Sequence, residues 1–142
     1  LKLEFVELLD KQDLLPSELS GGMLKRAAVA RALARDPKLV FMDEPSAGLD
    51  PVVASALDNL ILKIKDALGV SVVIVTHELE SAFKIASRIV VLDRGFIIFD
   101  GSVDAIRASD NPRIQALINR TAEPMAFDAD EHYRRIMGLP EG

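Results

Sequence analysis

Short apolar runs and one long amphipathic segment alternate in the central part of this 142-residue chain. The segment 38–43, with an apolar run in its middle, precedes the amphipathic segment Pro51–Leu68, and a second such segment follows at 71–76. Runs without polar alternation are typical of strands buried on both faces. The long segment starts with proline and is followed by Gly69, a pattern that favours a helix. Strand, helix and strand in this order predict a parallel βαβ unit and therefore an α/β fold.

Shorter elements are predicted on both sides of this unit. Helices are expected at residues 1–9, 22–35, 78–86, 103–108, 112–120 and 129–137, and strands at 88–92 and 96–99, joined as an antiparallel hairpin. Ser20 is placed to cap the helix at 22–35. The packing face of that helix is expected to comprise Ala27, Ala28, Ala32 and Leu33.

The composition excludes several classes of protein. Twenty-two acidic and 17 basic residues give a net charge of −5, and no basic cluster indicates a nucleic-acid surface. The absence of cysteine excludes disulfides and thiolate metal sites. Apolar runs such as 70–75 are too short to span a bilayer. The chain begins at Leu1 without an initiator methionine, which suggests a segment of a longer protein.

Two adjacent carboxylates end the first predicted strand, and a histidine ends the second. Ligands of open parallel sheets bind beyond the carboxyl ends of the strands, where Asp43, Glu44 and His77 are expected. Phosphoryl transfer to water needs a carboxylate that organises Mg²⁺ and a group that activates the water. Asp43 fits the metal, through water, and Glu44 fits the general base. His77 fits a donor to the terminal phosphate.

A Ser-Gly-Gly turn precedes the helix at 22–35. Ser20, Gly21 and Gly22 offer a hydroxyl, unhindered backbone N–H groups and the positive end of a helix, which suit an anion. Ordinary alternatives exist for each feature. The carboxylates also fit a solvent-exposed strand end, His77 a helix cap, and Ser-Gly-Gly a capped helix with a glycine turn.

In combination the motifs resemble one family closely. The segments LSGGM at 19–23, FMDEPSAGLD at 41–50 and VTHE at 75–78 are similar to those of the ATPase subunits of ATP-binding-cassette (ABC) transporters, over roughly residues 16–101. The G-x-x-x-x-G-K-[ST] loop that binds phosphates in such proteins is missing here, since none of the eight glycines precedes lysine. The resemblance therefore implies a partial P-loop NTPase fold whose N-terminal half is absent.

The resemblance also implies roles for individual residues. Ser20, Gly21 and Gly22 match the signature that contacts ATP held by the partner subunit, with Met23 where most members have glutamine. Asp43 matches the Walker B aspartate, Glu44 the catalytic glutamate and His77 the switch histidine, and Asp50 lies in the loop that crosses to the partner. The implied cofactors are ATP and Mg²⁺.

By the same resemblance the chain divides into three parts. Residues 1–35 correspond to the end of a helical subdomain with the signature, 36–101 to the catalytic α/β core and 102–142 to a C-terminal helical extension. The implied partners are a second ATPase subunit, in a homodimer, and integral membrane permease subunits, without nucleic acid. The implied location is the cytoplasmic side of the plasma membrane.

Several residues are most similar to the Mla-type branch, which traffics phospholipids or confers solvent resistance. They are Met23 in the signature, the segment AGLDP at 47–51, the segment NPRIQALINR at 111–120 and FDADEHY at 127–133. Two other functions remain as alternatives: a chromosome-maintenance or repair ATPase of the same superfamily, and an inert interaction fragment. Heptad repeats beside the signature would favour the repair ATPase, and none is present.

Overall fold

A computed structural model describes residues 2–120 of the chain, which separate into two compact units at Ile89 and Val90. The first unit holds helices α1 (Lys2–Phe5), α2 (Gly21–Ala32), α3 (Pro51–Leu68) and α4 (Leu79–Ile85), the short 3-10 helices η1 (Leu9–Lys11) and η2 (Pro16–Glu18), and strands β1 (Leu39–Asp43) and β2 (Ser71–Val75). The second holds most of β3 (Ile89–Asp93), followed by β4 (Phe96–Gly101), α5 (Val103–Arg107) and α6 (Pro112–Ile118). The predicted α/β class is confirmed.

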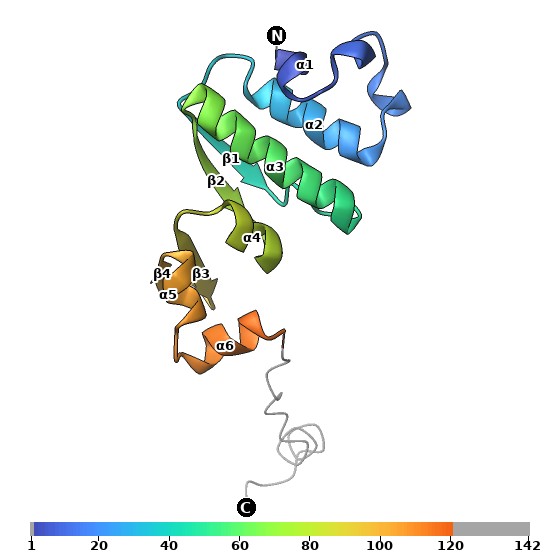
Figure 1. The fold of residues 1–142 in the computed structure, drawn as a ribbon. Coiled ribbons are helices and arrows are strands. Elements are labelled where there is room, and N and C mark those ends of the chain that lie inside the picture. Colours follow the sequence, from blue (N-terminus) through green and yellow to red (C-terminus); the bar gives the residue numbers. More distant parts are fainter. Residues whose placement is uncertain (1, 121–142) are drawn as a thin grey trace, which may run out of the picture. The chain divides into compact units, whose positions relative to one another are not determined.

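The predicted βαβ unit is present as expected. Strands β1 and β2 are parallel, with Val40 opposite Val72 and Asp43 opposite Val75, and α3 connects them (Figure 1). The bounds of α3 agree with the prediction residue for residue. At its end Gly69 adopts a left-handed φ of 61° and donates its N–H to the carbonyl of Lys65, a conformation that glycine takes without steric cost.

The core of the first unit lies between α2, α3 and β1. Helix α3 supplies five of its buried apolar side chains: Ala54, Leu57, Leu60, Ile61 and Ile64. Val29 of α2, Leu33 just after that helix and Val40 of β1 complete this contact. Complete burial of a leucine or isoleucine contributes about 1.5–3 kcal/mol, so the apolar stripe of α3 is the main element holding helices and strands together.

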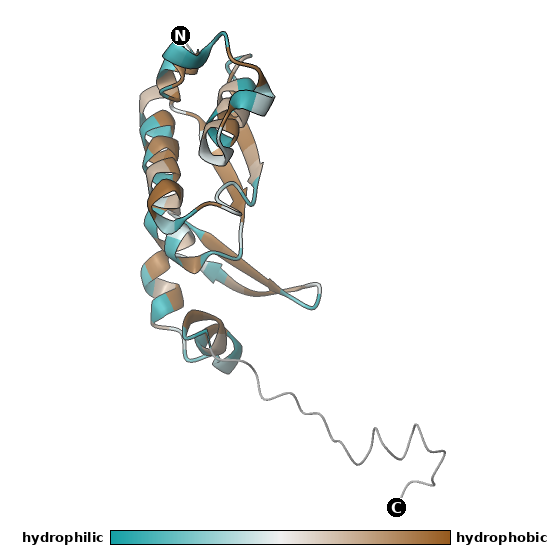
Figure 2. Cartoon of the chain, turned by 90° about the vertical axis from the view of Figure 1, so that its right-hand side faces the viewer, coloured by the Kyte–Doolittle hydropathy of each residue, from teal (hydrophilic) through white to brown (hydrophobic). Residues whose placement is uncertain are grey.

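The strands are not buried on both faces, which corrects the prediction. Leu39 and Phe41 on β1 are 46% and 72% exposed, and Val73 and Val75 on β2 are 44% and 60% exposed. Within residues 2–120 the helices cover only the opposite face, so burial alternates along both strands although hydropathy does not (Figure 2). These four side chains form an exposed apolar face, named here the open sheet face.

The N-terminal helix is shorter than predicted. Helix α1 ends at Phe5, and Glu7 has a φ of 58°, which breaks the helix. The break turns Val6 and Leu8 both into the core, with exposures of 0% and 4%. Residues two apart in a continuous helix face different directions and cannot do this.

Helix α2 ends earlier than expected and packs by a different face. It ends at Ala32, and its buried residues are Val29 and Ala30, followed by Leu33 just after the helix. Ala28 and Ala32 of the predicted face are exposed. Small apolar side chains occur on more than one side of this helix, so periodicity alone did not identify the buried side.

In the second unit, β3 and β4 pair as the predicted hairpin. Arg94 and Gly95 form its two-residue turn, and both have positive φ values, of 48° and 85°. Ile106 and Ile114 are fully buried.

The helix predicted at 129–137 lies outside the described residues. The division into parts at 35 and 101 remains a prediction. Among the described helices, none has the length and apolar character needed to cross a bilayer.

Candidate functional site

Glu44 lies at the carboxyl ends of the two parallel strands. It follows the last residue of β1, and its N–H donates to the Val75 carbonyl at 2.9 Å, which extends the pairing with β2 by one residue. Its φ of 45° is uncommon for a residue other than glycine. This backbone conformation starts the turn into Pro45 and places the Glu44 side chain beside the residues that follow β2.

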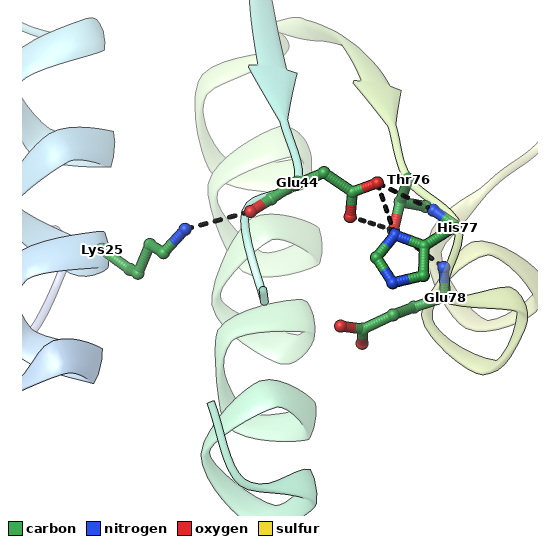
Figure 3. A network of polar contacts seen from close by, with 5 residues as sticks. All are labelled: Lys25, Glu44, Thr76, His77 and Glu78. Atoms are coloured by element: carbon green, nitrogen blue, oxygen red, sulfur yellow. Dashed lines mark hydrogen bonds and ion pairs between the residues drawn. The ribbon is translucent and has the colours of Figure 1, made fainter. Parts of the chain in front are cut away.

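Both carboxylate oxygens of Glu44 are hydrogen-bonded to the segment after β2 (Figure 3). Oε1 lies 2.7 Å from Nδ1 of His77 and accepts the His77 backbone N–H at 3.1 Å. Oε2 accepts the Thr76 hydroxyl at 3.2 Å, and the same hydroxyl oxygen accepts the Glu78 N–H at 3.0 Å. The carboxylate is therefore held in place by groups from a neighbouring strand end.

This contact changes the acidity of both partners. The hydrogen bond from His77 is the main reason that the pKa of Glu44 is lowered, and Thr76 acts in the same direction. The hydrogen bond to Glu44, and then its charge, raise the pKa of His77. The His77 side chain is 79% exposed and that of Glu44 31%, so the pair lies at an accessible surface.

Lys25 of α2 contacts the backbone of the same glutamate. Its Nζ donates to the Glu44 carbonyl at 3.0 Å, in a partly buried position (Figure 3). The Ala47 N–H also reaches this carbonyl, at 3.2 Å. Sequence reasoning missed Lys25 because 19 residues separate it from Glu44. Thr76 was missed too, although its place beside His77 at a strand end was a usable signal.

The Ser-Gly-Gly segment starts α2 as predicted. Ser20 is the N-cap, and its Oγ accepts the Met23 N–H at 3.3 Å. At Gly22 a Cβ atom would come within 2.7 Å of Cγ1 of Val53, so glycine permits the close approach of α2 to α3. Ser20 and Gly21 are exposed, and their surface is accessible to an anion.

Asp50 is placed at the start of α3, where its Oδ1 accepts the N–H groups of Val52 and Val53 at 3.0 and 3.1 Å. Its carboxylate therefore caps a helix. Gly21 and Gly22 lie close to Leu49 and Val53, which flank this cap. The structure thus brings the two predicted partner-facing segments together, the Ser-Gly-Gly turn and the Asp50 loop, and separately brings Glu44 to His77.

Asp43 is the exposed last residue of β1. Within residues 2–120 no three His, Asp, Glu or Cys side chains gather as a metal-binding cluster. Mg²⁺ keeps most of its waters and commonly binds one or two carboxylates plus substrate phosphates. A single accessible carboxylate at a strand end fits that type of site, and it does not fit a metal cage made only of protein.

Comparisons with known proteins show which sequences and structures this chain is similar to. A family model described as "AAA domain, putative AbiEii toxin, Type IV TA system" matches residues 2–83. The chain is 37% identical over 140 residues to the "intermembrane phospholipid transport system ATP-binding protein MlaF" of Escherichia coli K12. It is 39% identical over 139 residues to the "methionine import ATP-binding protein MetN" of Haemophilus influenzae Rd.

A solved structure has the same fold. It is the ATP-binding cassette MJ1267 of an ABC transporter, with 32% identity and a TM-score of 0.72 over 82% of this chain and 46% of that one. The alignments with MlaF and MetN cover 96% and 98% of this chain, but 52% and 40% of those proteins. The chain thus spans about half the length of the relatives that it matches.

Proposed function

This chain belongs to the ATPase subunits of ABC transporters, and on that premise we propose that it is the C-terminal part of the subunit that hydrolyses ATP. The observation that carries the proposal is the pairing of Glu44 with His77 at the ends of two adjacent parallel strands. This is the place where an open α/β sheet receives its ligand.

Glu44 acts as the general base in this proposal. It takes a proton from water as the water oxygen attacks the terminal phosphorus of ATP, and the phosphorus–oxygen bond to ADP breaks. In the structure its carboxylate is hydrogen-bonded to His77 and Thr76. Oε1 has two such contacts and Oε2 one, so the second lone pair of Oε2 is the site at which we expect the attacking water to bind.

His77 links the base to the phosphate. Its Nδ1 contacts Glu44, which directs Nε2 of the exposed ring away from the carboxylate (Figure 3). In the imidazolium form, which the hydrogen bond to Glu44 favours by raising the pKa of His77, Nε2 also carries a proton and is available to donate to the terminal phosphate. One imidazole would thus contact both the base and the terminal phosphate. The position of the Glu44 carboxylate would then depend on whether that phosphate is bound.

Asp43 is the proposed metal-organising carboxylate. Mg²⁺, when bound with ATP, supplies neutralisation of charge on the phosphate oxygens. Asp43 would hold it through water at the end of β1. Its neighbour Glu44 would activate the water and would not bind the metal. The chain turns at Glu44, and its side chain contacts the segment after β2.

The Ser20–Gly22 turn and Asp50 form the proposed surface for a second ATPase subunit. The two segments lie together at the N-termini of α2 and α3. The helix dipole at the start of α2 favours phosphate, whereas the Asp50 carboxylate already caps α3. By the likeness to ABC ATPases, the phosphates would be held by the phosphate loop of the other subunit. A membrane permease is the further proposed partner, reached from the cytoplasmic side.

Phospholipid trafficking is the proposed transport function. It is supported by the likeness to MlaF over 140 residues and by Met23 and the segment at 47–51. The likeness to MetN favours methionine import as the second candidate. Both relatives align with nearly the whole chain, so an experiment must separate the two.

Two exchange proteins test the proposal. In one, this chain replaces the 140 matching residues of MlaF, and in the other it replaces the 139 matching residues of MetN. We expect phosphate release from ATP in both and phospholipid transport by the first. A folded first exchange protein that releases no phosphate, while intact MlaF does, would overturn the ATPase proposal. Methionine import by the second, without lipid transport by the first, would overturn the lipid proposal alone.

A further inference from the structure

The Glu44 carbonyl receives two donors from different parts of the first unit. One is the Ala47 N–H, three residues ahead in the same turn, at 3.2 Å. The other is Nζ of Lys25 in α2, at 3.0 Å. The backbone turn accounts for the first contact. The second joins the helix that begins with Ser-Gly-Gly to the residue that carries the proposed base.

Glu44 needs such support because of its backbone. A non-glycine residue with positive φ is held in that conformation by its surroundings. Its N–H pairs with Val75 and its side chain with His77 and Thr76. The carbonyl is the remaining polar group of the residue, and the ammonium of Lys25 is the charged group that holds it.

The position of Lys25 on α2 links the start of this helix to the backbone of Glu44. Lys25 lies one helical turn after Gly21, and the start of this helix contacts Leu49 and Val53 beside the Asp50 cap. A shift at the start of α2 therefore acts on Nζ of Lys25, and through it on the backbone of Glu44. The helix has 12 residues and a buried face, so its first turns move together.

We propose that Lys25 is a positioning residue, which holds the Glu44 backbone in its left-handed conformation and couples the Ser-Gly-Gly end of α2 to the orientation of the Glu44 carboxylate. This inference rests on the proposed role of Glu44 as general base. It adds that engagement of Ser20–Gly22 by a partner's nucleotide and the placement of the base are linked within one subunit.

Hydrogen exchange of backbone amides tests the contact in this chain without any catalysis. In a Lys25→Met variant we expect the amides of His77 and Glu44 to exchange at least about tenfold faster. The reason is that movement of Glu44 weakens both the bond from the His77 N–H to its carboxylate and the bond from its own N–H to the Val75 carbonyl. Lys25→Arg should restore slow exchange. The amide of Ile61, in the buried face of α3, reports global unfolding and should be unchanged.

Lys84→Met is the matched control. Nζ of Lys84 also donates to a backbone carbonyl, that of Ser55 at 2.8 Å, but it joins α4 to α3. This variant should leave exchange at His77 unchanged. Unchanged exchange at His77 in Lys25→Met, or an equal effect of Lys84→Met, would overturn the proposal. If Lys25→Met unfolds the chain, Lys25→Gln, which keeps a shorter donor, should give an intermediate rate.

Turnover in the longer ATPase subunit gives the second readout. Lys25→Met should lower kcat by about tenfold to a hundredfold while the KM for ATP changes little, because only the base is displaced. Lys25→Arg should recover most of kcat. Absence of hydrolysis by the unmodified subunit would refute the proposed function, whereas normal kcat in Lys25→Met together with altered exchange would refute the coupling alone.

Discussion

Nδ1 of His77 lies 2.7 Å from Oε1 of Glu44, although 33 residues separate them in the sequence. The contact exists because β1 and β2 are parallel neighbours that end at the same level, Asp43 opposite Val75. The residues after each strand then face one another. A proposed base and a proposed phosphate sensor are thus brought into contact by the pairing of β1 with β2.

Replacement of Glu44 by Gln tests the base in the longer subunit. Gln keeps the size and most hydrogen bonds of the side chain but cannot take the proton. We expect turnover to fall by about two or more orders of magnitude, in line with general-base contributions, and ATP affinity to persist. Phosphate release and nucleotide binding measure the two effects. Asp66→Asn, at an exposed position of α3, is the control, and nearly normal turnover in Glu44→Gln would show that another group is the base.

The pKa of His77 provides a test in this chain. Glu44 raises it from the ordinary value of 6.5, so the imidazolium form stabilises the fold below pH 6.5, and that contribution is lost as the pH rises through the folded-state value. The ionised Glu44, whose pKa is lowered, stabilises the fold above pH 4.5. That contribution is lost as the pH falls through the folded-state pKa of Glu44. The ion pair is therefore fully formed between these limits.

An NMR titration of the His77 ring measures this effect. Glu44→Gln should lower the pKa of His77 toward 6.5, and Glu78→Gln should lower it less, because Glu78 acts only by charge and more weakly. A larger shift from Glu78→Gln would contradict the contact. Both side chains are accessible to solvent, so we expect the titration to change more clearly than the thermal stability.

Gly22 tests the packing at the start of α2. In Gly22→Ala the new methyl group meets Cγ1 of Val53, a branched side chain with little rotational freedom in a helix. We expect a loss of about 1–3 kcal/mol in the free energy of unfolding, measured by urea denaturation. Gly21→Ala, where the nearest atom is 3.8 Å away, should be nearly neutral. Val53→Ala should relieve the clash in a double variant, and equal losses at both glycines would contradict the steric explanation.

Asp58 is a buried carboxylate between α3 and α4, and its replacement tests how the stability of the fold depends on pH. It is 3% exposed and accepts the Ser81 hydroxyl at 2.9 Å, with Nζ of Lys84 at 3.9 Å. Burial raises the pKa of Asp58, so the folded state loses stability as the pH rises from about 3.8 through the folded-state value. Relative to the wild type, Asp58→Asn should gain stability between about pH 4 and pH 7. Denaturation curves at both pH values check this, and Asp66→Asn should not show the same trend.

The open sheet face predicts association of this 142-residue chain. Phe41 and Val75 are 72% and 60% exposed, and β2 pairs only with β1 among the described residues. Apolar faces and unpaired strand edges favour contact with a second copy. Light scattering at micromolar concentration should show a dimer or larger species, and Phe41→Glu should weaken it. Val52→Glu, exposed on α3 rather than on the sheet, is the control, and a stable wild-type monomer would contradict the prediction.

Features that depend on neighbours in the sequence were predictable. The bounds of α3 follow from the Asp50 cap, Pro51 and Gly69, and each acts through backbone groups within four residues. The Ser20 cap and the two-residue turn at Arg94 and Gly95 are local in the same sense. The motif residues Glu44 and His77 could be assigned to strand ends because apolar runs mark strands from the sequence alone.

Packing between distant segments determined the features that the sequence did not predict. The left-handed conformation of Glu7, the exposed face of β1 and the contact of Lys25 with Glu44 depend on which elements lie against each other, and no spacing rule encodes that. Hydropathy records only that a residue is apolar. Whether it is covered, and which donor reaches a given carbonyl, is determined when helices and strands from distant parts of the chain compete for the same core.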